Sequence, residues 1–327
     1  MSWGGKRVLV TGAGGFIGSH LAERLVELGA TTRAFVHYRG DGFRGWLEQS
    51  PRKSDMEFHA GDISDRDSVS QAMKGTDVVF HLAALIAIPY SYHAPASYVR
   101  TNIEGTLNVL QAARECGTSR VVHTSTSEVY GSALQVPITE RHPLQAQSPY
   151  SATKIAADKL AEAFHLSFQV PVVTVRPFNT FGPRQSARAV IPTIITQCLS
   201  GGTVRLGNLT PTRDLNYVSD TAEGFVLAGE APQAVGRTIN IGSGREISIR
   251  DLVELIGTIV GRQARVEADG QRVRPETSEV QRLLADNSVS RDVLRWSPKL
   301  SLEEGLGRTV EWFRDNLHVY RSGVYVL

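Results

Sequence analysis

Hydrophobic and polar positions alternate in two ways along the first half of the chain. Short runs of β-branched and apolar residues are typical of buried strands, and the longer amphipathic stretches between them are typical of helices. In one such stretch Leu21, Leu25 and Leu28 share a helical face, and Gly29 follows as a terminator. The pattern predicts strands at Arg7–Thr11, Thr32–His37, Met56–His59, Val78–Leu82, Arg120–Ser125 and Val172–Arg176, and helices at Ser19–Leu28, Asp65–Lys74, Ser97–Cys116 and Pro149–Phe168.

This alternation predicts an α/β fold with a doubly wound parallel sheet. After Pro177, loops rich in proline and glycine interrupt the pattern. We therefore expect a first domain over residues 1–176 and a smaller α/β lobe over residues 177–327, with residues 215–241 able to return to the first domain. The helices predicted beyond Pro177 are Ile191–Leu199, Asp220–Glu230, Ile249–Val260 and Leu302–Asn316.

Composition narrows the possible partners. The 327 residues include 35 Lys and Arg against 33 Asp and Glu, a formal net charge of +2. Nucleic-acid binding is not expected, because it relies on clustered positive charge. Two cysteines, Cys116 and Cys198, are too few for a disulfide framework or a thiolate metal site. The longest largely apolar run, Val78–Ile88, is shorter than the roughly 18 residues of a membrane span. We expect a cytoplasmic protein with no metal and no membrane span.

A glycine-rich turn joins the first predicted strand to the first predicted helix. Its glycines have the spacing of dinucleotide-binding turns. Glycine permits the tight turn and lets a pyrophosphate approach the helix N-terminus closely. The first domain is therefore predicted to be a Rossmann-type domain that binds NAD(P) through Gly12, Gly15, Phe16, Ile17 and Gly18.

The end of the second predicted strand bears on the choice between NAD and NADP. NAD-binding domains usually carry a carboxylate there, which binds the ribose hydroxyls. Here residues 33–39 include none, and Arg39, with His37, could bind a 2′-phosphate. A solvated arginine is the alternative. NADP is favoured over NAD, and Asp62, after the third strand, is expected to accept a bond from the adenine amino group.

Tyr150 and Lys154 lie four residues apart at the start of a predicted helix. Residues with this spacing share a helical face. A neighbouring ammonium and a positive nicotinamide ring both favour the phenolate, so Tyr150 is predicted to act as a base near neutral pH. A Tyr/Lys pair with this spacing is common on protein surfaces. Here it follows a dinucleotide-binding turn and a fifth predicted strand, and this position indicates a catalytic role.

Thr126, Ser127 and Glu128 follow the fifth predicted strand. Ligands bind at the carboxyl ends of parallel strands. Thr126 is expected to hydrogen-bond a sugar hydroxyl near the phenol of Tyr150. Glu128 adds an acid–base group that hydride transfer does not need. The alternative is a helix-capping run with a solvated glutamate.

Five motifs together resemble the extended short-chain dehydrogenase/reductases that act on nucleotide sugars, the NAD-dependent epimerase/dehydratase family. The resemblance spans essentially the whole chain. Within that family, the triplet from Thr126 to Glu128 resembles the active site of 4,6-dehydratases, whereas epimerases usually carry small residues at the position of Glu128. The stretch Arg176–Gln197 most resembles configuration-retaining UDP-N-acetylglucosamine 4,6-dehydratases. The motifs are Thr-Gly-x-x-Gly-x-x-Gly from Thr11, His81–Ala84, Tyr150-x-x-x-Lys154, Arg176–Asn179 and Arg213–Asp214.

The resemblance also implies further contacts. It puts Asn179, Ile191 and Pro192 along the diphosphate and uracil of a substrate, and Arg213 and Arg274 at its two phosphates. It leaves the roles of two other arginines open, Arg184 and Arg188. The remaining cofactor contacts that it implies are Ile63, Leu82, Ala83, Ala84, Thr124 and Pro177.

The implied reaction converts a nucleotide-hexose to the 4-keto-6-deoxy sugar, with tightly bound NADP or NAD regenerated each cycle. Tyr150, assisted by Thr126, takes the O4 proton while C4 loses a hydride. Glu128 removes the C5 proton, which leaves with the C6 hydroxyl as water. Hydride then returns to C6 and C5 is reprotonated. Dehydratases of the dTDP-glucose type carry an aspartate at the position of Ser127, and that aspartate protonates the departing hydroxyl. Serine is a poor acid, so Glu128 is expected to serve both steps.

Two other functions stay open at this point. A nucleotide-sugar C4-epimerase would share the fold, the cofactor and the Tyr150–Lys154 pair, but it has no use for a C5 base. A non-catalytic dinucleotide-binding regulator would not need to keep the catalytic side chains. The resemblance also implies a homodimer, which pairs the helices predicted at Ser97–Cys116 and Pro149–Phe168.

Overall fold

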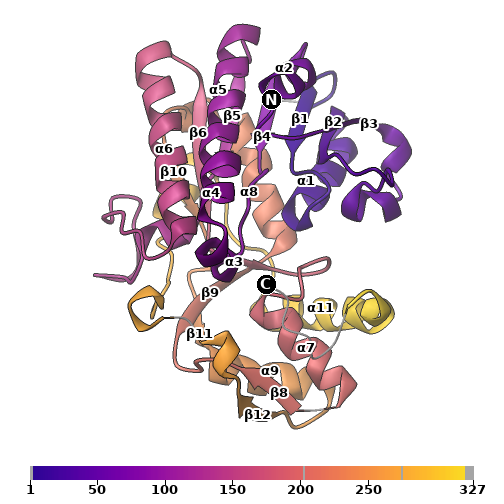
Figure 1. Ribbon diagram of the computed structural model, residues 1–327, viewed down its shortest axis with the longest axis vertical. Helices are drawn as coiled ribbons and strands as arrows, with labels where there is room; N and C mark the ends of the chain where they lie inside the picture. The colour runs from indigo at the N-terminus through magenta and orange to yellow at the C-terminus, as the bar shows by residue number, and fades with distance from the viewer. Residues whose placement is uncertain (1–2, 202, 274, 321–327) are drawn as a thin grey trace.

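The computed structural model describes residues 3–201, 203–273 and 275–320, which form an upper and a lower part in Figure 1. In the upper part, seven strands of the described chain form a parallel sheet in the order β10-β6-β5-β4-β1-β2-β3. The predicted α/β fold with a doubly wound parallel sheet is confirmed. The strands are β1 (Arg7–Thr11), β2 (Thr31–His37), β3 (Met56–Gly61), β4 (Val78–His81), β5 (Arg120–Thr124), β6 (Val172–Pro177) and β10 (Thr238–Ile241).

Alternate residues of these strands feed two hydrophobic cores, one on each face of the sheet. Val8 and Val10 belong to the core beneath α1 and α8, whereas Leu9 belongs to the core beneath α2, α5 and α6. Burial on both faces explains why the strands are continuous apolar runs. The helices are α1 (Phe16–Glu27), α2 (Arg66–Met73), α5 (Gly105–Cys116), α6 (Pro149–Phe168) and α8 (Val218–Glu230).

Two predicted helices differ from the observed ones by more than two residues. Helix α1 begins at Phe16, three residues earlier than predicted, because Gly15 is its N-cap. The single helix predicted at Ser97–Cys116 consists of α4 (Pro95–Tyr98), a π-helical turn (Val99–Glu104) and α5. Asn102 in the π-helical turn hydrogen-bonds the main chain of Leu85 and the hydroxyl of Thr153. The wider turn thus connects the loop after β4 with α6, a tertiary contact that periodicity does not reveal.

The lower lobe has its own hydrophobic core, formed by three helices and the strands packed on them. The chain crosses between the two parts more than once, because β10 pairs with β6 in the main sheet. No helix of the described residues is long and apolar enough to cross a membrane. The lobe contains β7 (Asn179–Phe181), α7 (Val190–Ser200), β8 (Thr203–Leu206), β9 (Thr212–Tyr217), β11 (Glu246–Ser248), α9 (Ile249–Val260), β12 (Arg265–Ala268) and α11 (Leu302–Asn316); the other helices are α3 (Ile88–His93) and α10 (Ser288–Leu294).

Candidate active site

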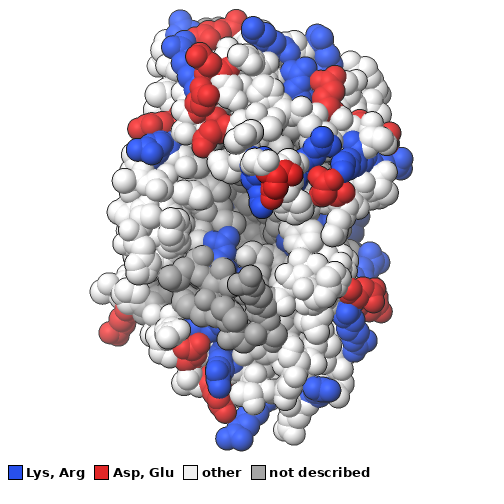
Figure 2. Space-filling model, turned by 45° about the vertical axis from the view of Figure 1, so that its right-hand side comes forward, with Lys and Arg blue, Asp and Glu red and all other residues white. Residues whose placement is uncertain are grey.

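A cavity of about 890 Å³ lies between the carboxyl ends of the main sheet and the lower lobe. Figure 2 shows the surface hollowed at mid-height, where the two parts meet. Asp62, Ile63 and Pro192 do not line this cavity, and Arg274 lies outside the described residues. The predicted site residues that do line it are Gly12, Gly15, Phe16, Ile17, Gly18, His37, Arg39, Leu82, Ala83, Ala84, Thr124, Thr126, Ser127, Glu128, Tyr150, Lys154, Pro177, Asn179, Ile191 and Arg213.

The glycine-rich loop fits a dinucleotide pyrophosphate. Gly12 has φ of +70°, and a Cβ there would lie 2.9 Å from the backbone nitrogen of Ala83. A Cβ on Gly18 would overlap the carbonyl oxygen of Gly12. Gly15 caps α1 without a side-chain hydrogen bond, so the first N–H groups of the helix stay available to an anion. The loop therefore needs glycine for its own geometry and presents a helix N-terminus to the cavity.

The end of β2 carries the predicted discriminator between NAD and NADP. Arg39 lines the cavity, but its guanidinium donates to Asp41 at 2.8 Å and lies 4.9 Å from the ring centroid of Phe43. Asp62 accepts from the backbone N–H and the hydroxyl of Ser64. Its second oxygen lies 3.9 Å from Nδ1 of His37. Asp62 therefore lies behind His37, which lines the cavity, whereas Arg39 lines the cavity itself.

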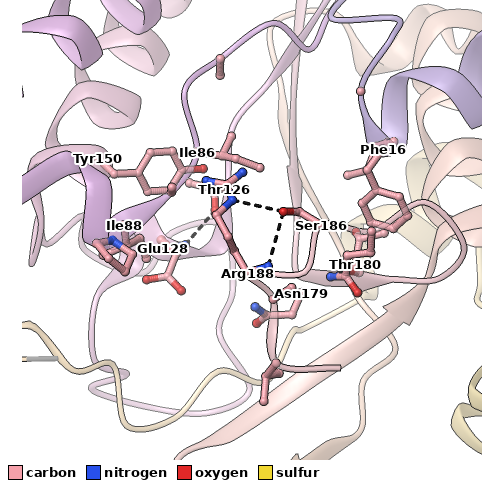
Figure 3. Close-up of a pocket in the computed structure, with 18 of the residues that line it drawn as sticks. Phe16, Ile86, Ile88, Thr126, Glu128, Tyr150, Asn179, Thr180, Ser186 and Arg188 are labelled. Atoms are coloured by element: carbon pink, nitrogen blue, oxygen red, sulfur yellow. Dashed lines mark hydrogen bonds between the residues drawn. The ribbon is translucent and has the colours of Figure 1, made fainter. Parts of the chain in front are cut away.

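Tyr150, Thr126 and Glu128 gather on one side of the cavity (Figure 3). The phenol of Tyr150 is buried and hydrogen-bonds the hydroxyl of Thr126. Thr126 Oγ1 accepts the backbone N–H of Glu128 at 3.2 Å. Its own proton is therefore available to the phenol oxygen. Glu128 follows β5 in a short 3₁₀ turn, which brings its carboxylate to the cavity beside that pair.

Burial shifts the acid–base properties of Tyr150 and Lys154. Lys154 Nζ donates to the carbonyl oxygen of Thr124 at 2.6 Å. Burial lowers the pKa of Lys154 to about 8, although the negative charge of Asp158 raises it in part. Burial also raises the pKa of Tyr150, and the hydrogen bond from Thr126 offsets this only in part. The expected lowering of the Tyr150 pKa is therefore not found in the protein alone, because desolvation of the phenolate dominates.

A buried carboxylate, Asp158, lies one helical turn beyond Lys154 and was missed in the sequence. Its oxygens lie 3.1 Å from Nε2 of His123, 2.7 Å from the hydroxyl of Ser125 and 2.9 Å from the guanidinium of Arg176. Burial alone would raise the pKa of Asp158, but the His123 hydrogen bond and the Arg176 charge lower it to about 2. The recurring spacing of four residues from Tyr150 through Lys154 could have revealed it.

Asn179, Ile191 and Arg213 line the cavity from the lower lobe. Arg213 contacts a carboxylate oxygen of Glu279 at 3.3 Å. Asn179 Oδ1 and Thr124 Oγ1 are buried and have no hydrogen-bond partner within the described structure. Buried polar atoms normally have partners, so these two atoms on the cavity wall fit a site that receives a polar ligand.

The structure separates the two arginines whose roles the sequence left open. Arg184 makes two hydrogen bonds with Glu23 of α1 and does not line the cavity, whereas Arg188 does line it. Other lining residues were missed because they lie in loops and in the short helix α3, where no periodic pattern shows which side chains face the cavity. They include Ile86, Ile88, Tyr92, His93, Gln185 and Ser186.

Known proteins of similar sequence and structure include both dehydratases and epimerases. The family model described as GDP-mannose 4,6 dehydratase matches residues 9–309. A UDP-glucose 4-epimerase of Mycolicibacterium smegmatis is 34% identical over 94% of this chain and 99% of its own length. A dTDP-glucose 4,6-dehydratase of Streptomyces antibioticus is 34% identical over 94% of this chain and 92% of its own. One similar solved structure is DesIV, a dTDP-glucose 4,6-dehydratase of Streptomyces venezuelae with NAD bound. Its TM-score is 0.88 and its sequence identity is 31%. The match covers 96% of this chain and 99% of DesIV.

The fold and site therefore define an enzyme of the nucleotide-sugar dehydratase and epimerase class with a dinucleotide cofactor. The chain belongs to the GDP-mannose 4,6-dehydratase family, within the extended short-chain dehydrogenase/reductases. The family resemblance predicted from the motifs is confirmed.

Proposed function

We propose that the protein is a nucleotide-sugar 4,6-dehydratase that acts on UDP-N-acetylglucosamine and retains the configuration at C5. The observation that carries this proposal is the carboxylate of Glu128 in the cavity beside Tyr150 and Thr126. A second acid–base group in that place serves water loss, whereas oxidation at C4 alone does not need it. The choice of sugar and the retention at C5 rest on the motif resemblance in Arg176–Gln197.

Each side chain has a distinct part in the proposed reaction. The phenolate of Tyr150, stabilised by a hydrogen bond from Thr126, accepts the O4 proton and becomes the neutral phenol. The 4-keto group then acidifies the C5 proton, which Glu128 removes; the C5–H electron pair forms the C5–C6 double bond as the C6–O bond breaks. Glu128 returns this proton to the departing hydroxyl, because Ser127 is a poor acid. NAD(P), when bound through the glycine-rich loop, supplies a reversible hydride acceptor.

A second candidate function is a C4-epimerase. The M. smegmatis relative with that name is as similar as the S. antibioticus dehydratase. Epimerisation would use Tyr150 in the same way and would leave Glu128 without a proton to transfer.

Product masses distinguish the two. We would incubate the protein with UDP-N-acetylglucosamine, UDP-glucose, GDP-N-acetylglucosamine and GDP-mannose, and expect one water lost from the UDP-N-acetylglucosamine alone. Glu128→Gln should keep cofactor binding and abolish water loss, while Glu115→Gln, an exposed control, should behave as the parent. An isomer of unchanged mass would establish the epimerase, and full dehydratase turnover by Glu128→Gln would contradict the proposed role of Glu128.

The proposal includes NADP as the cofactor. Arg39 on the cavity wall supports this choice, because a forked guanidinium suits a 2′-phosphate. Its bond to Asp41 would have to be exchanged for one to the phosphate. Mass spectrometry of the cofactor released from purified protein tests the choice, and NAD as the sole cofactor would contradict it. In refilled protein, Arg39→Ala should weaken NADP about tenfold and leave NAD unchanged.

We further propose a cytoplasmic homodimer. Support for the assembly comes from exposed apolar side chains at the end of α6, where Leu166 is 72% and Phe168 45% exposed. A light-scattering mass of one chain would contradict the dimer, and export of a tagged protein from its host cell would contradict the cytoplasmic location.

A further inference from the structure

The loop of residues 182–189, between β7 and α7, forms part of the cavity wall and is held by α1. The two Nη atoms of Arg184 donate to the two carboxylate oxygens of Glu23 at 2.9 and 3.0 Å. Arg184 has φ of +71°, a conformation that a non-glycine residue keeps only when its surroundings hold it. Paired hydrogen bonds of this kind fix direction as well as distance. The loop therefore has a defined course although it contains no helix or strand.

Two further contacts hold the same loop. Nε2 of His20 on α1 lies 3.1 Å from the carbonyl oxygen of Pro183. The hydroxyl of Tyr320 donates to the carbonyl oxygen of Gln185 at 2.9 Å. With these contacts, the loop is fixed on both sides of Arg184, so the residues that follow project into the cavity from a stable base.

Arg188 is the cation that this loop presents. Its Nε donates to the hydroxyl of Ser186 at 3.2 Å, and its two Nη atoms have no partner among the described residues. Figure 3 shows its side chain running from the loop toward Thr126. Burial raises the pKa of Tyr98 and the charge of Arg188 lowers it, while the Tyr98 ring lies edge-on to Tyr150 at 6.3 Å. The guanidinium thus lies on the catalytic side of the cavity.

This position has a chemical consequence that rests on the proposed function. The reacting sugar lies against Tyr150, and the nucleotide lies against the lower lobe, where Leu206 and Arg213 line the cavity. The phosphate that carries the sugar must lie between these two ends. We propose that Arg188 binds this sugar-linked phosphate through its two free Nη atoms and so selects diphosphate substrates. A forked guanidinium matches two phosphate oxygens, and the uncapped N-terminus of α7 adds favourable partial charge.

Equilibrium binding to the protein with its cofactor in place tests the proposal. UDP-N-acetylglucosamine, UDP and UMP are titrated by calorimetry into the parent, Arg188→Ala, Arg188→Lys and the control Arg205→Ala, an exposed arginine of the same lobe outside the cavity. Arg188→Ala should weaken UDP-N-acetylglucosamine and UDP about 10- to 100-fold, the usual effect of losing a charged hydrogen-bond pair. UMP, which lacks the second phosphate, should bind unchanged. Arg188→Lys should lie between the parent and the alanine variant, and Arg205→Ala should match the parent.

Other outcomes overturn the proposal. Equal weakening of UMP would put Arg188 at the first phosphate, and unchanged binding of all three ligands would exclude a phosphate contact. Weaker NAD(P) in cofactor-depleted protein, with the nucleotides unaffected, would assign Arg188 to the cofactor diphosphate instead. If the parent prefers GDP or dTDP ligands, UDP-N-acetylglucosamine is not the substrate and the proposed function fails on that point. Comparing the diphosphate with the monophosphate of the preferred base then decides the role of Arg188. A parent that binds no nucleotide overturns both proposals.

Discussion

The two walls of the cavity differ in how they hold their functional groups. Tyr150 and Lys154 stand on a long helix packed against the parallel sheet, and they are buried above the carboxylate of Asp158. The loop that carries Arg188 forms the opposite wall and depends on point contacts such as Arg184 with Glu23. Proton transfer needs fixed distances and exclusion of water, whereas recognition of a phosphate tolerates a loop if that loop is anchored. Changes in the first wall should therefore affect turnover and strongly affect stability. Changes in the second wall should affect affinity and have a smaller effect on stability.

The largest effect is expected from Tyr150→Phe, which removes the proposed proton acceptor and keeps the buried ring. Turnover should fall about 1,000-fold, within the range for loss of a general base. Binding of the nucleotide sugar should change little, because the opposite wall is untouched. Steady-state kinetics and calorimetry measure the two quantities, with Tyr38→Phe, an exposed residue outside the cavity, as control. Near-parental turnover would remove Tyr150 from the chemistry.

Asp158→Asn tests whether the first wall owes its rigidity to the buried charge network. Loss of the carboxylate leaves the buried Arg176 without its ion-pair partner, so the free energy of unfolding should fall by about 3–5 kcal/mol. Urea unfolding at pH 7 measures this, with the exposed Asp292→Asn as control. The pKa of Asp158 is lowered to about 2 in the folded protein, so its stabilisation should be present above pH 4 and lost as the pH falls toward 2. A change below about 1 kcal/mol would mean that packing alone holds this wall.

A smaller effect is expected from His20, which supports the loop of the second wall. Burial and the charge of Arg184 lower the pKa of His20 to about 4. The unfolded chain therefore binds an additional proton between about pH 6.5 and 4, and stability falls as the pH decreases through that range. The loss due to His20 should reach about 2 kcal/mol at pH 5 relative to pH 7. Urea unfolding of the parent and His20→Gln at both values measures it, and equal pH dependence in the two proteins would contradict it.

The smallest effect is expected from Glu23→Gln, which weakens the anchor of the loop without touching the cavity. KM for the nucleotide sugar should rise about fivefold with kcat unchanged, a modest coupling between α1 and the substrate wall. In an Arg188→Ala background the same change should have almost no effect on KM, because the phosphate contact is already absent. Additive effects in the double variant would show that Glu23 acts independently of Arg188.

Local patterns in the sequence predicted the scaffold and one wall of the cavity. The strands are continuous apolar runs, the glycine-rich turn has a fixed spacing, and Tyr150 and Lys154 are four residues apart on one helix. These signals involve residues close together in the chain, and helix and strand geometry converts them directly into positions. The predicted helix at Pro149–Phe168 and strand at Arg7–Thr11 agree with α6 and β1 residue for residue.

The tertiary structure decided what depends on residues distant in the sequence. Asp158 acquires its partners His123 and Arg176 from two strands of the sheet. Burial of the Tyr150 phenol in the folded protein reverses the expected shift of its pKa. Arg184 and Arg188 are the same residue type four positions apart in one loop, so the sequence could not separate them. Glu23, 161 positions earlier than Arg184, binds one of the two, and Arg188 is left to face the cavity. Glu23 pairs with Arg184 and so leaves Arg188 able to reach a ligand. Only the folded chain brings Glu23 near this loop.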